Sequence, residues 1–229
     1  MNRRQFSKAS LSFLLAATLQ VPSLSLPAHA TRDIDEPFRI KQEDQLKLKK
    51  RFRRKQISFK TQEPPGTIIV DPYSKYLYLI LGAGQAMRYG VGVGRQGFAW
   101  SGEAAIRRKA KWPRWTPPKE MVERDELAAK WVNGMPGGVA NPLGARALYL
   151  FQGDVDTLYR IHGTFQLETI GTAVSSGCIR MINADVADLY ERIQIGAKVI
   201  VVSNSTQIAG GLPPRRKGFL LDRLFGRNQ

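Results

Sequence analysis

Short apolar runs separated by turn residues dominate the middle of the chain. Such runs occupy 67–70 (TIIV), 75–81 (KYLYLIL), 86–93 (AMRYGVGV), 147–151, 158–161 and 198–202. Turn residues bound them, as at Asp71-Pro72 and Gly82-Ala83-Gly84. Short segments rich in branched and aromatic residues predict β-strands. We therefore expect a mainly β fold, a β-sandwich or open barrel with a few short helices.

One later segment, NADVADLYERI, has the period of a helix. Its apolar residues fall on one helical face and are Val186, Leu189, Tyr190 and Ile193. Asn183 is expected to cap this helix, and Asp185 stands in the first turn, where the helix dipole favours an anion. Because the helix would begin five residues after Cys178, it would fix the backbone on that side of the cysteine.

An irregular stretch from Trp100 to Gly144 interrupts the strand-like runs. It contains WPRWTPPKEM and GMPGGVANPLG, and it holds Trp100, Trp112, Trp115 and Trp131. Its prolines and glycines predict an inserted Trp/Pro-rich loop with one short helix near 123–131. Two interpretations stay open. The loop either covers the domain as packing, or it forms a lid or wall of a substrate site.

The first thirty residues have the pattern of an export signal. A basic start precedes a short apolar stretch, Leu11 to Leu19, and the small-residue site Ala28-His29-Ala30, which predicts a cleavable secretory signal over 1–30. The pair Arg3-Arg4 resembles the twin-arginine export signal, with an ordinary Sec signal as the alternative. The apolar stretch is shorter than the roughly 20 residues that a spanning helix needs. We expect a mature protein from Thr31 in the periplasm or cell envelope.

Positive charge concentrates at the two ends of the predicted mature chain. The sequence has 35 Lys and Arg residues against 19 Asp and Glu, and the net charge is +16. Eleven basic and five acidic residues lie in 31–62, and five basic and one acidic residue lie in 213–229. This distribution predicts a basic leader over 31–62, a folded domain over 63–204 and a basic tail over 205–229.

The run KLKKRFRRK at 47–55 is the densest part of this charge. It is either a solvated, partly disordered leader or a contact for anionic envelope polymers and lipid head groups. Nucleic acid is not an expected partner of an exported protein.

The segment HGTFQLETIGTAVSSGCIRM, 162–181, holds the histidine and the cysteine that remain once the signal is removed, His162 and Cys178. Two ligands cannot close a tetrahedral zinc site, so we expect no metal. One cysteine cannot form an intramolecular disulfide, and an unpaired thiol is a liability in an oxidising compartment. Nucleophilic chemistry would justify it. The alternative is a structural histidine and a small buried apolar cysteine.

The residues around this pair suit a nucleophile. Ser175-Ser176-Gly177 predicts a flexible polar turn that leaves the amides of Gly177 and Cys178 facing a cavity, where they stabilise a thiolate and an oxyanion. His162 is expected to end the strand YRIH, and beside a thiol it lowers the thiol pKa and supplies a proton to the leaving group. Gly163 would leave the ring uncrowded, and a backbone carbonyl near it could orient the ring as well as an acid could.

The same twenty residues resemble the signature of the L,D-transpeptidase family, the YkuD-like catalytic domain: HGT, five residues, IG, three residues, then Ser-x-Gly-Cys, a branched aliphatic, Arg and Met. The resemblance extends over about residues 65 to 203. It implies Cys178 as the nucleophile, His162 as proton acceptor and donor, and the Gly177 and Cys178 amides among the oxyanion donors.

Three further positions match or depart from that pattern and are candidates for substrate binding. Arg180 matches the family's arginine and either contacts a substrate carboxylate or braces the loop. Ser175 matches the family's serine and is interpreted as a structural hydrogen-bonding residue rather than a participant. Ser176 stands where many members have a second histidine, so any role of that imidazole is missing here.

The resemblance also implies a reaction. Cys178 would attack the L-centre carbonyl of meso-diaminopimelate in a peptidoglycan stem tetrapeptide and release D-alanine. An amine would then take the acyl group, which gives a 3-3 crosslink, attachment of an envelope protein through a lysine, or D-amino acid exchange. No cofactor is expected. The alternatives are an L,D-carboxypeptidase, with water as acceptor, and a catalytically silent cell-wall-binding module.

Overall fold

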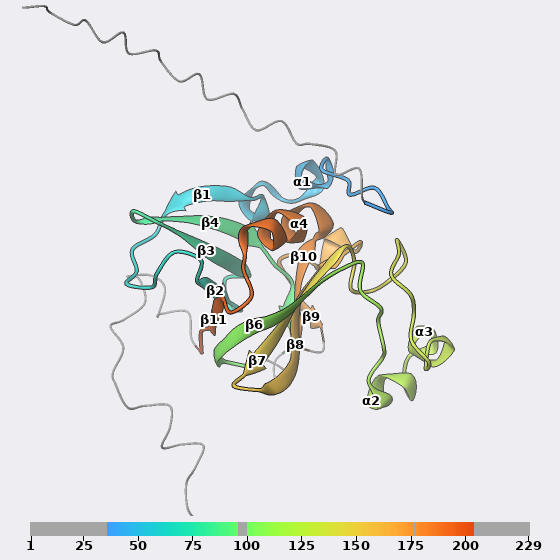
Figure 1. Cartoon of the computed structure of the whole chain (residues 1–229). Coiled ribbons are helices and arrows are strands. Elements are labelled where there is room, and N and C mark those ends of the chain that lie inside the picture. Colours follow the sequence, from blue (N-terminus) through green and yellow to red (C-terminus); the bar gives the residue numbers. More distant parts are fainter. Residues whose placement is uncertain (1–35, 96–99, 176, 204–229) are drawn as a thin grey trace, which may run out of the picture. The chain divides into compact units, whose positions relative to one another are not determined.

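A long sheet organises the chain. The computed structural model describes residues 36–95, 100–175 and 177–203, and within them nine strands form one sheet in the order β1-β4-β3-β2-β11-β6-β7-β8-β10 (Figure 1). Two short strands, β5 and β9, form a second sheet of two strands. The predicted mainly β fold is confirmed.

The strands of the large sheet are β1 (Lys55–Ser58), β2 (Ile68–Asp71), β3 (Tyr76–Gly82), β4 (Gln85–Gly90), β6 (Gly102–Lys111), β7 (Arg146–Gln152), β8 (Val155–Thr164), β10 (Ile179–Ile182) and β11 (Lys198–Val201). The small sheet pairs β5 (Val93–Gly94) with β9 (Ala173–Ser175). The helices are α1 (Asp44–Lys47), α2 (Lys119–Val122), α3 (Glu126–Lys130) and α4 (Asn183–Arg192), and the 3-10 turns are η1 (Lys50–Phe52) and η2 (Leu167–Thr169).

The main hydrophobic core lies between the two halves of the large sheet and α4. It joins apolar residues of β2, β3 and β4 with those of β6, β7, β8 and β10 and with the apolar face of the helix. The hydroxyl of Tyr89 in β4 donates a hydrogen bond to Asp188 in α4 at 2.7 Å. Strands far apart in the sheet order therefore enclose one core, as expected for a sandwich or open barrel.

The predicted helix is confirmed, but its cap is not. Ile182 occupies the N-cap position, and Asn183 is already the first helical residue, without a capping bond. The buried Asn183 side chain instead accepts a hydrogen bond from the Ala145 backbone N–H at 2.8 Å. Gly144 and Gly163 allow this approach, because a Cβ on either would lie within 2.3 Å of the Asn183 oxygen. Asn183 thus ties α4 to the start of β7 rather than capping it.

Two strand assignments need correction. The predicted run 86–93 divides into β4 and β5, because the chain leaves the sheet at Val91 and pairs Gly92 with Arg180. The predicted loop from Trp100 to Gly144 begins too early, since β6 occupies Gly102–Lys111 and pairs with β7 and β11. The sequence GEAAIRRKAK has few branched residues, so β6 depends on its neighbours rather than on its own propensity. The remaining loop carries α2 and α3 and projects from the sheet (Figure 1).

The prediction of a solvated, partly disordered leader is wrong for its described part, residues 36–62. Strand β1 pairs with β4 in antiparallel register. Leu48 and Phe52 are buried and form a cluster with Ile170 and Ile182. Apolar residues spaced within the basic run reach the domain, while most of the cationic side chains between them point to solvent.

The predicted signal over 1–30 and the tail over 205–229 lie outside the described residues. Within the part of the chain that the structure describes, no helix is long and apolar enough to cross a membrane.

Candidate active site

His162 lies inside β8, next to the strand that follows Cys178. The parallel strands β8 and β10 pair Ile161 with Ile179 and His162 with Arg180. The prediction that His162 ends its strand is therefore wrong by two residues, because pairing with β10 continues to Thr164. The backbone of His162 is paired on both sides, with Arg180 of β10 and with Ala147 of β7, so the position of its side chain is fixed by the sheet.

Alternation along these strands separates a core face from a site face. Ile161, Ile179 and Met181 belong to the main core. His162 and Arg180 therefore point to the other face, because successive side chains of a strand alternate. Cys178 immediately precedes β10, at the level of Arg160, whose backbone hydrogen bonds to the thiol. The fold thus brings Cys178 to the strand that carries His162, although sixteen positions separate them in sequence.

Ser175 braces the loop that carries the thiol. Its hydroxyl donates a hydrogen bond to the Cys178 carbonyl at 2.7 Å and accepts one from the Gly177 N–H at 3.2 Å. Gly177 has φ of 123°, a conformation open to glycine. The Gly177 amide, predicted to be an oxyanion donor, donates its hydrogen bond to the Ser175 hydroxyl in this structure. Ser176 lies outside the described residues.

The carbonyl of Gly163 orients the His162 ring, as the sequence suggested. Nδ1 lies 2.7 Å from that oxygen. A carbonyl only accepts, so Nδ1 carries the proton and Nε2 of the neutral ring is a proton acceptor. Gly163 is needed less for the ring than for α4, since a Cβ there would meet the Asn183 side chain. Burial lowers the pKa of His162 to about 4, and the charges of Arg180 and Arg160 add to this effect.

Burial also governs the thiol. Cys178 is partly exposed, and its surroundings raise its pKa through desolvation. The Arg160 backbone hydrogen bond and the charges of Arg160 and Arg180 lower the pKa and offset only part of this. The expected lowering of the thiol pKa is therefore not found. The resting pair is a neutral thiol and a neutral imidazole, so ionisation must accompany attack on a substrate.

Arg180 connects the site strand to the loop between His162 and Cys178. Its guanidinium donates to the Gln166 side chain at 3.1 Å. Its backbone exchanges two hydrogen bonds with Gly92, of 2.8 and 2.9 Å. These contacts fit the bracing interpretation of Arg180, while its charge acts on both reacting residues.

Trp112, which directly follows β6, packs against two other aromatic rings. Trp112 packs edge-on against Phe38 at 4.9 Å and stacks on Phe165 at 6.5 Å between ring centroids. Asn141, fully buried, donates hydrogen bonds to the Pro113 and Pro136 carbonyls and holds the loop that follows β6. The Trp/Pro-rich loop is thus partly packed against the domain and stands beside the strands that carry the site.

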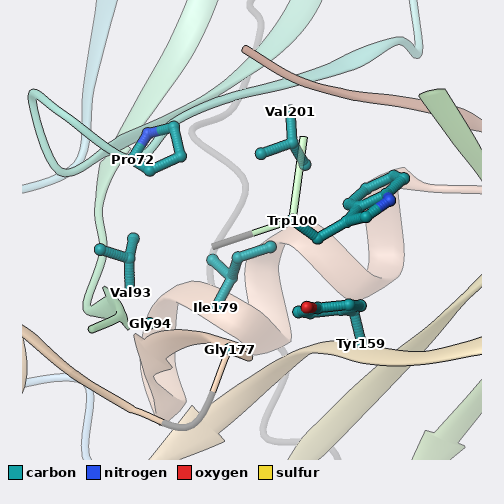
Figure 2. A pocket seen from close by; sticks show the side chains of 8 residues that line it. All are labelled: Pro72, Val93, Gly94, Trp100, Tyr159, Gly177, Ile179 and Val201. Carbon is teal, nitrogen blue, oxygen red and sulfur yellow. The ribbon is translucent and has the colours of Figure 1, made fainter. Parts of the chain in front are cut away.

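A small apolar pocket lies on the core side of the cysteine loop (Figure 2). It is lined by Pro72, Val93, Gly94, Trp100, Tyr159, Gly177, Ile179 and Val201. Trp100 and Tyr159 stack at 5.7 Å. Gly177 is part of the lining, which contains no Asp, Glu, Lys or Arg side chain, so the cysteine loop borders an uncharged cavity.

A further set of charged residues, not predicted from the sequence, lies on the site face. Tyr149 pairs with Arg108 on one side and with Arg160 on the other. The two guanidiniums lie 4.5 and 4.4 Å from the Tyr149 ring centroid. The strand alternation in YRIH could have predicted that Arg160 belongs to the site face, because it precedes His162 by two residues and side chains two apart in a strand share a face.

No group of three or more His, Cys, Asp and Glu residues gathers as a metal site among the described residues. Residues 65–201 match the model of the YkuD family, described as the L,D-transpeptidase catalytic domain. The chain belongs to this family. The match spans more than half of the chain and includes strands β2 to β11, the helix α4 and the segment that carries His162 and Cys178.

Relatives of the L,D-transpeptidase domain agree with this assignment. "Probable L,D-transpeptidase YbiS" of Escherichia coli (strain K12) is 31% identical over 58% of this chain and 43% of its own length. "Probable L,D-transpeptidase ErfK/SrfK" of the same strain is 36% identical over 42% of this chain and 30% of its own length. The chain thus spans less than half the length of these curated relatives.

A crystal structure from Brucella melitensis is 48% identical over 71% of this chain and all of its own, with a TM-score of 0.47. It is described as a "probable carnitine operon oxidoreductase caia". That description belongs to the Brucella protein, and a score of this size carries no argument about the fold.

Proposed function

We propose that the chain is a peptidoglycan L,D-transpeptidase in which Cys178 is the nucleophile and His162 the general base and acid. One observation carries the proposal. The His162 ring is buried and its Nδ1 lies 2.7 Å from the Gly163 carbonyl oxygen, and burial lowers its pKa, so Nε2 is left to accept a proton on the face where the partly exposed thiol lies. Family membership supplies the reaction class.

In the first step of the proposed reaction, His162 Nε2 takes the thiol proton while Cys178 sulfur bonds to the L-centre carbonyl carbon of meso-diaminopimelate in a stem tetrapeptide. The backbone amide of Cys178 donates to the oxyanion. The carbon–nitrogen bond to D-alanine then breaks, and the imidazolium returns its proton to the leaving amine. A thioester remains on Cys178.

In the second step an amine attacks the thioester, and His162 removes its proton and returns it to the departing sulfur. A diaminopimelate side-chain amine gives a 3-3 crosslink, a lysine of an envelope protein gives wall attachment, and a free D-amino acid gives an exchanged stem. Arg180 braces the loop and adds positive charge near the thiolate as it forms. Neither step of the proposed reaction requires a cofactor.

Mass spectrometry of purified disaccharide tetrapeptides incubated with the protein, alone and with added amines, tests this function. We expect loss of the mass of D-alanine and gain of the amine, both abolished in Cys178→Ala. Hydrolysis alone would identify an L,D-carboxypeptidase. Release of D-alanine by Cys178→Ala would refute the nucleophile, and wall binding without any reaction of the unmodified protein would identify a silent wall-binding module.

We also place the protein in the periplasm or cell envelope, where its substrate lies, and propose peripheral contact with anionic envelope surfaces. The support is a set of exposed cations on the otherwise anchored segment: Lys47, Lys49, Lys50, Arg51 and Lys55. Co-sedimentation with vesicles that contain an anionic lipid should fall steeply between low and physiological salt. Equal sedimentation with neutral vesicles would refute the electrostatic contact.

A further inference from the structure

We propose that Arg108 binds a carboxylate of the donor stem peptide, so that a row of side chains across the site face recognises substrate at one end and reacts with it at the other. The inference rests on the proposed function, because it names a contact of the same substrate. It assigns a role to residues outside the HGT and Ser-x-Gly-Cys motifs.

The strand register builds the row. Arg108 in β6 pairs with Tyr149 in β7, which pairs with Arg160 in β8. Arg160 lies beside Cys178, to which its backbone hydrogen bonds. Neighbouring strands are about 4.8 Å apart, so three strand spacings separate Arg108 from Cys178 by about 14 Å at the backbone. Because an arginine side chain is long, the guanidinium of Arg108 can lie closer to Cys178 than the two backbones do, and a bound stem peptide can span the remaining distance.

The two arginines of the row differ in how their charge is used. Arg160 forms a bidentate pair with Asp156, with contacts of 2.6 and 2.8 Å, and its side chain is 14% exposed. Arg108 is exposed, and its charge helps to lower the pKa of Asp156, but no hydrogen bond or salt bridge joins its guanidinium to an acid in the described part of the chain. The flat side of its guanidinium lies over Tyr149 at 4.5 Å. Its edge donors therefore remain for an anion while its position is held by stacking.

A carboxylate is the ligand class that fits. Five N–H donors in a fixed fork match a carboxylate with two parallel hydrogen bonds. The donor stem has two internal carboxylates several bonds from the scissile carbonyl, the α-carboxylate of D-glutamate and the carboxylate on the D-centre of diaminopimelate. Both present the same chemistry, so the experiment must separate them.

Arg108 can be changed without altering the charges that act on the reacting pair. The arginine charges that shift the pKa of Cys178 and His162 are those of Arg160 and Arg180. Arg107 offers a matched control, because it is the neighbouring residue, its side chain is 51% exposed and its partner is Asp154 at 3.7 Å. Arg107→Gln removes the same charge from the same strand.

The test is calorimetric binding of the disaccharide tetrapeptide to Cys178→Ala protein, which cannot turn it over. We expect Arg108→Gln to raise the dissociation constant about tenfold and Arg107→Gln to raise it less than twofold. Three peptides are compared: the free acid, the form amidated at D-glutamate and the form amidated at the D-centre of diaminopimelate. Amidation of the recognised carboxylate should weaken binding by the same factor and remove the effect of Arg108→Gln.

The outcomes separate this inference from the proposed function. Equal effects of Arg107→Gln and Arg108→Gln, an Arg108 effect that survives amidation of both carboxylates, or absence of any binding would overturn the subsite. Binding that depends on Arg108, with no D-alanine release by the unmodified protein, would keep the subsite and refute the reaction. D-alanine release with binding independent of Arg108 would keep the reaction and refute the subsite.

Discussion

At the scale of residues, burial leaves both reacting groups uncharged. Desolvation disfavours a thiolate and an imidazolium alike, so it raises the pKa of Cys178 and lowers that of His162 to about 4. The arginine charges act in opposite senses on the two groups' ionisation, because a cation favours the thiolate and disfavours the imidazolium. A preformed thiolate–imidazolium pair is therefore not the resting state, unlike the ionised sulfur that the sequence suggested.

The rate of Cys178 alkylation by iodoacetamide should consequently follow a pKa above that of a free thiol. Because only the thiolate reacts, we expect slow alkylation at pH 7 and a rise that continues through pH 9. Glutathione in the same buffers is the control, with an ordinary thiol pKa near 8.5 to 9. A rate already at its plateau at pH 7 would show that the thiolate forms in the resting enzyme.

At the scale of elements, the buried side chain of Phe52 packs the segment before β1 against the rest of the domain. Phe52 is 5% exposed and packs in a cluster with Leu48 and Ile170. A Cβ on Gly171 would lie 2.2 Å from its ring, and a Cβ on Gly90 would lie 2.6 Å from its Cβ. Phe52 therefore packs closely against Gly90 and Gly171, where a larger residue would clash, and Gly171 belongs to the loop that joins His162 to Cys178.

Phe52→Ala should therefore lower the free energy of unfolding by about 3 kcal/mol, the usual cost of emptying a buried aromatic site. Leu46→Ala, on the same segment but 69% exposed, should change it by less than about 0.5 kcal/mol. Chemical denaturation of both variants measures this difference. Similar small losses in the two would mean that the segment does not depend on Phe52.

At the scale of the whole molecule, Asp185 links the same segment to α4. It is fully buried in the first helical turn, with Gln45 donating to one oxygen and Arg54 at 3.7 Å from it. Its other oxygen has no hydrogen-bond partner among the described residues. Burial raises the pKa of Asp185 to about 7, Asp188 adds to this, and Arg54 and Gln45 oppose it.

This raised pKa makes the stability of the fold pH-dependent. An unfolded aspartate has a pKa near 3.9, so between about pH 4 and 7 the folded state holds a proton that the unfolded state has lost. The stability that this protonated carboxyl contributes is complete below about pH 4 and is lost as the pH rises through about 7, on the order of 4 kcal/mol in total.

Asp185→Asn removes that titration. The difference in unfolding free energy between Asp185→Asn and the unmodified protein, measured by denaturation at pH 4.5, 6 and 7.5, should shift in favour of the variant as pH rises. A pH-independent difference would show that Asp185 keeps an ordinary pKa in the fold.

The sequence by itself determined the local features of this protein. Alternation and branching gave β2, β3, β7 and β11, helical spacing gave α4, and the motif from His162 to Cys178 identified the family, because each depends on neighbours along the chain. The tertiary structure alone decided the rest. Strand β6 forms because it pairs with β7 and β11. Phe52 packs against Gly90 and Gly171, which are distant from it in sequence. Burial raises the pKa of Cys178, where the sequence predicted that it would be lowered. These depend on desolvation and on contacts between distant residues, which no local pattern records.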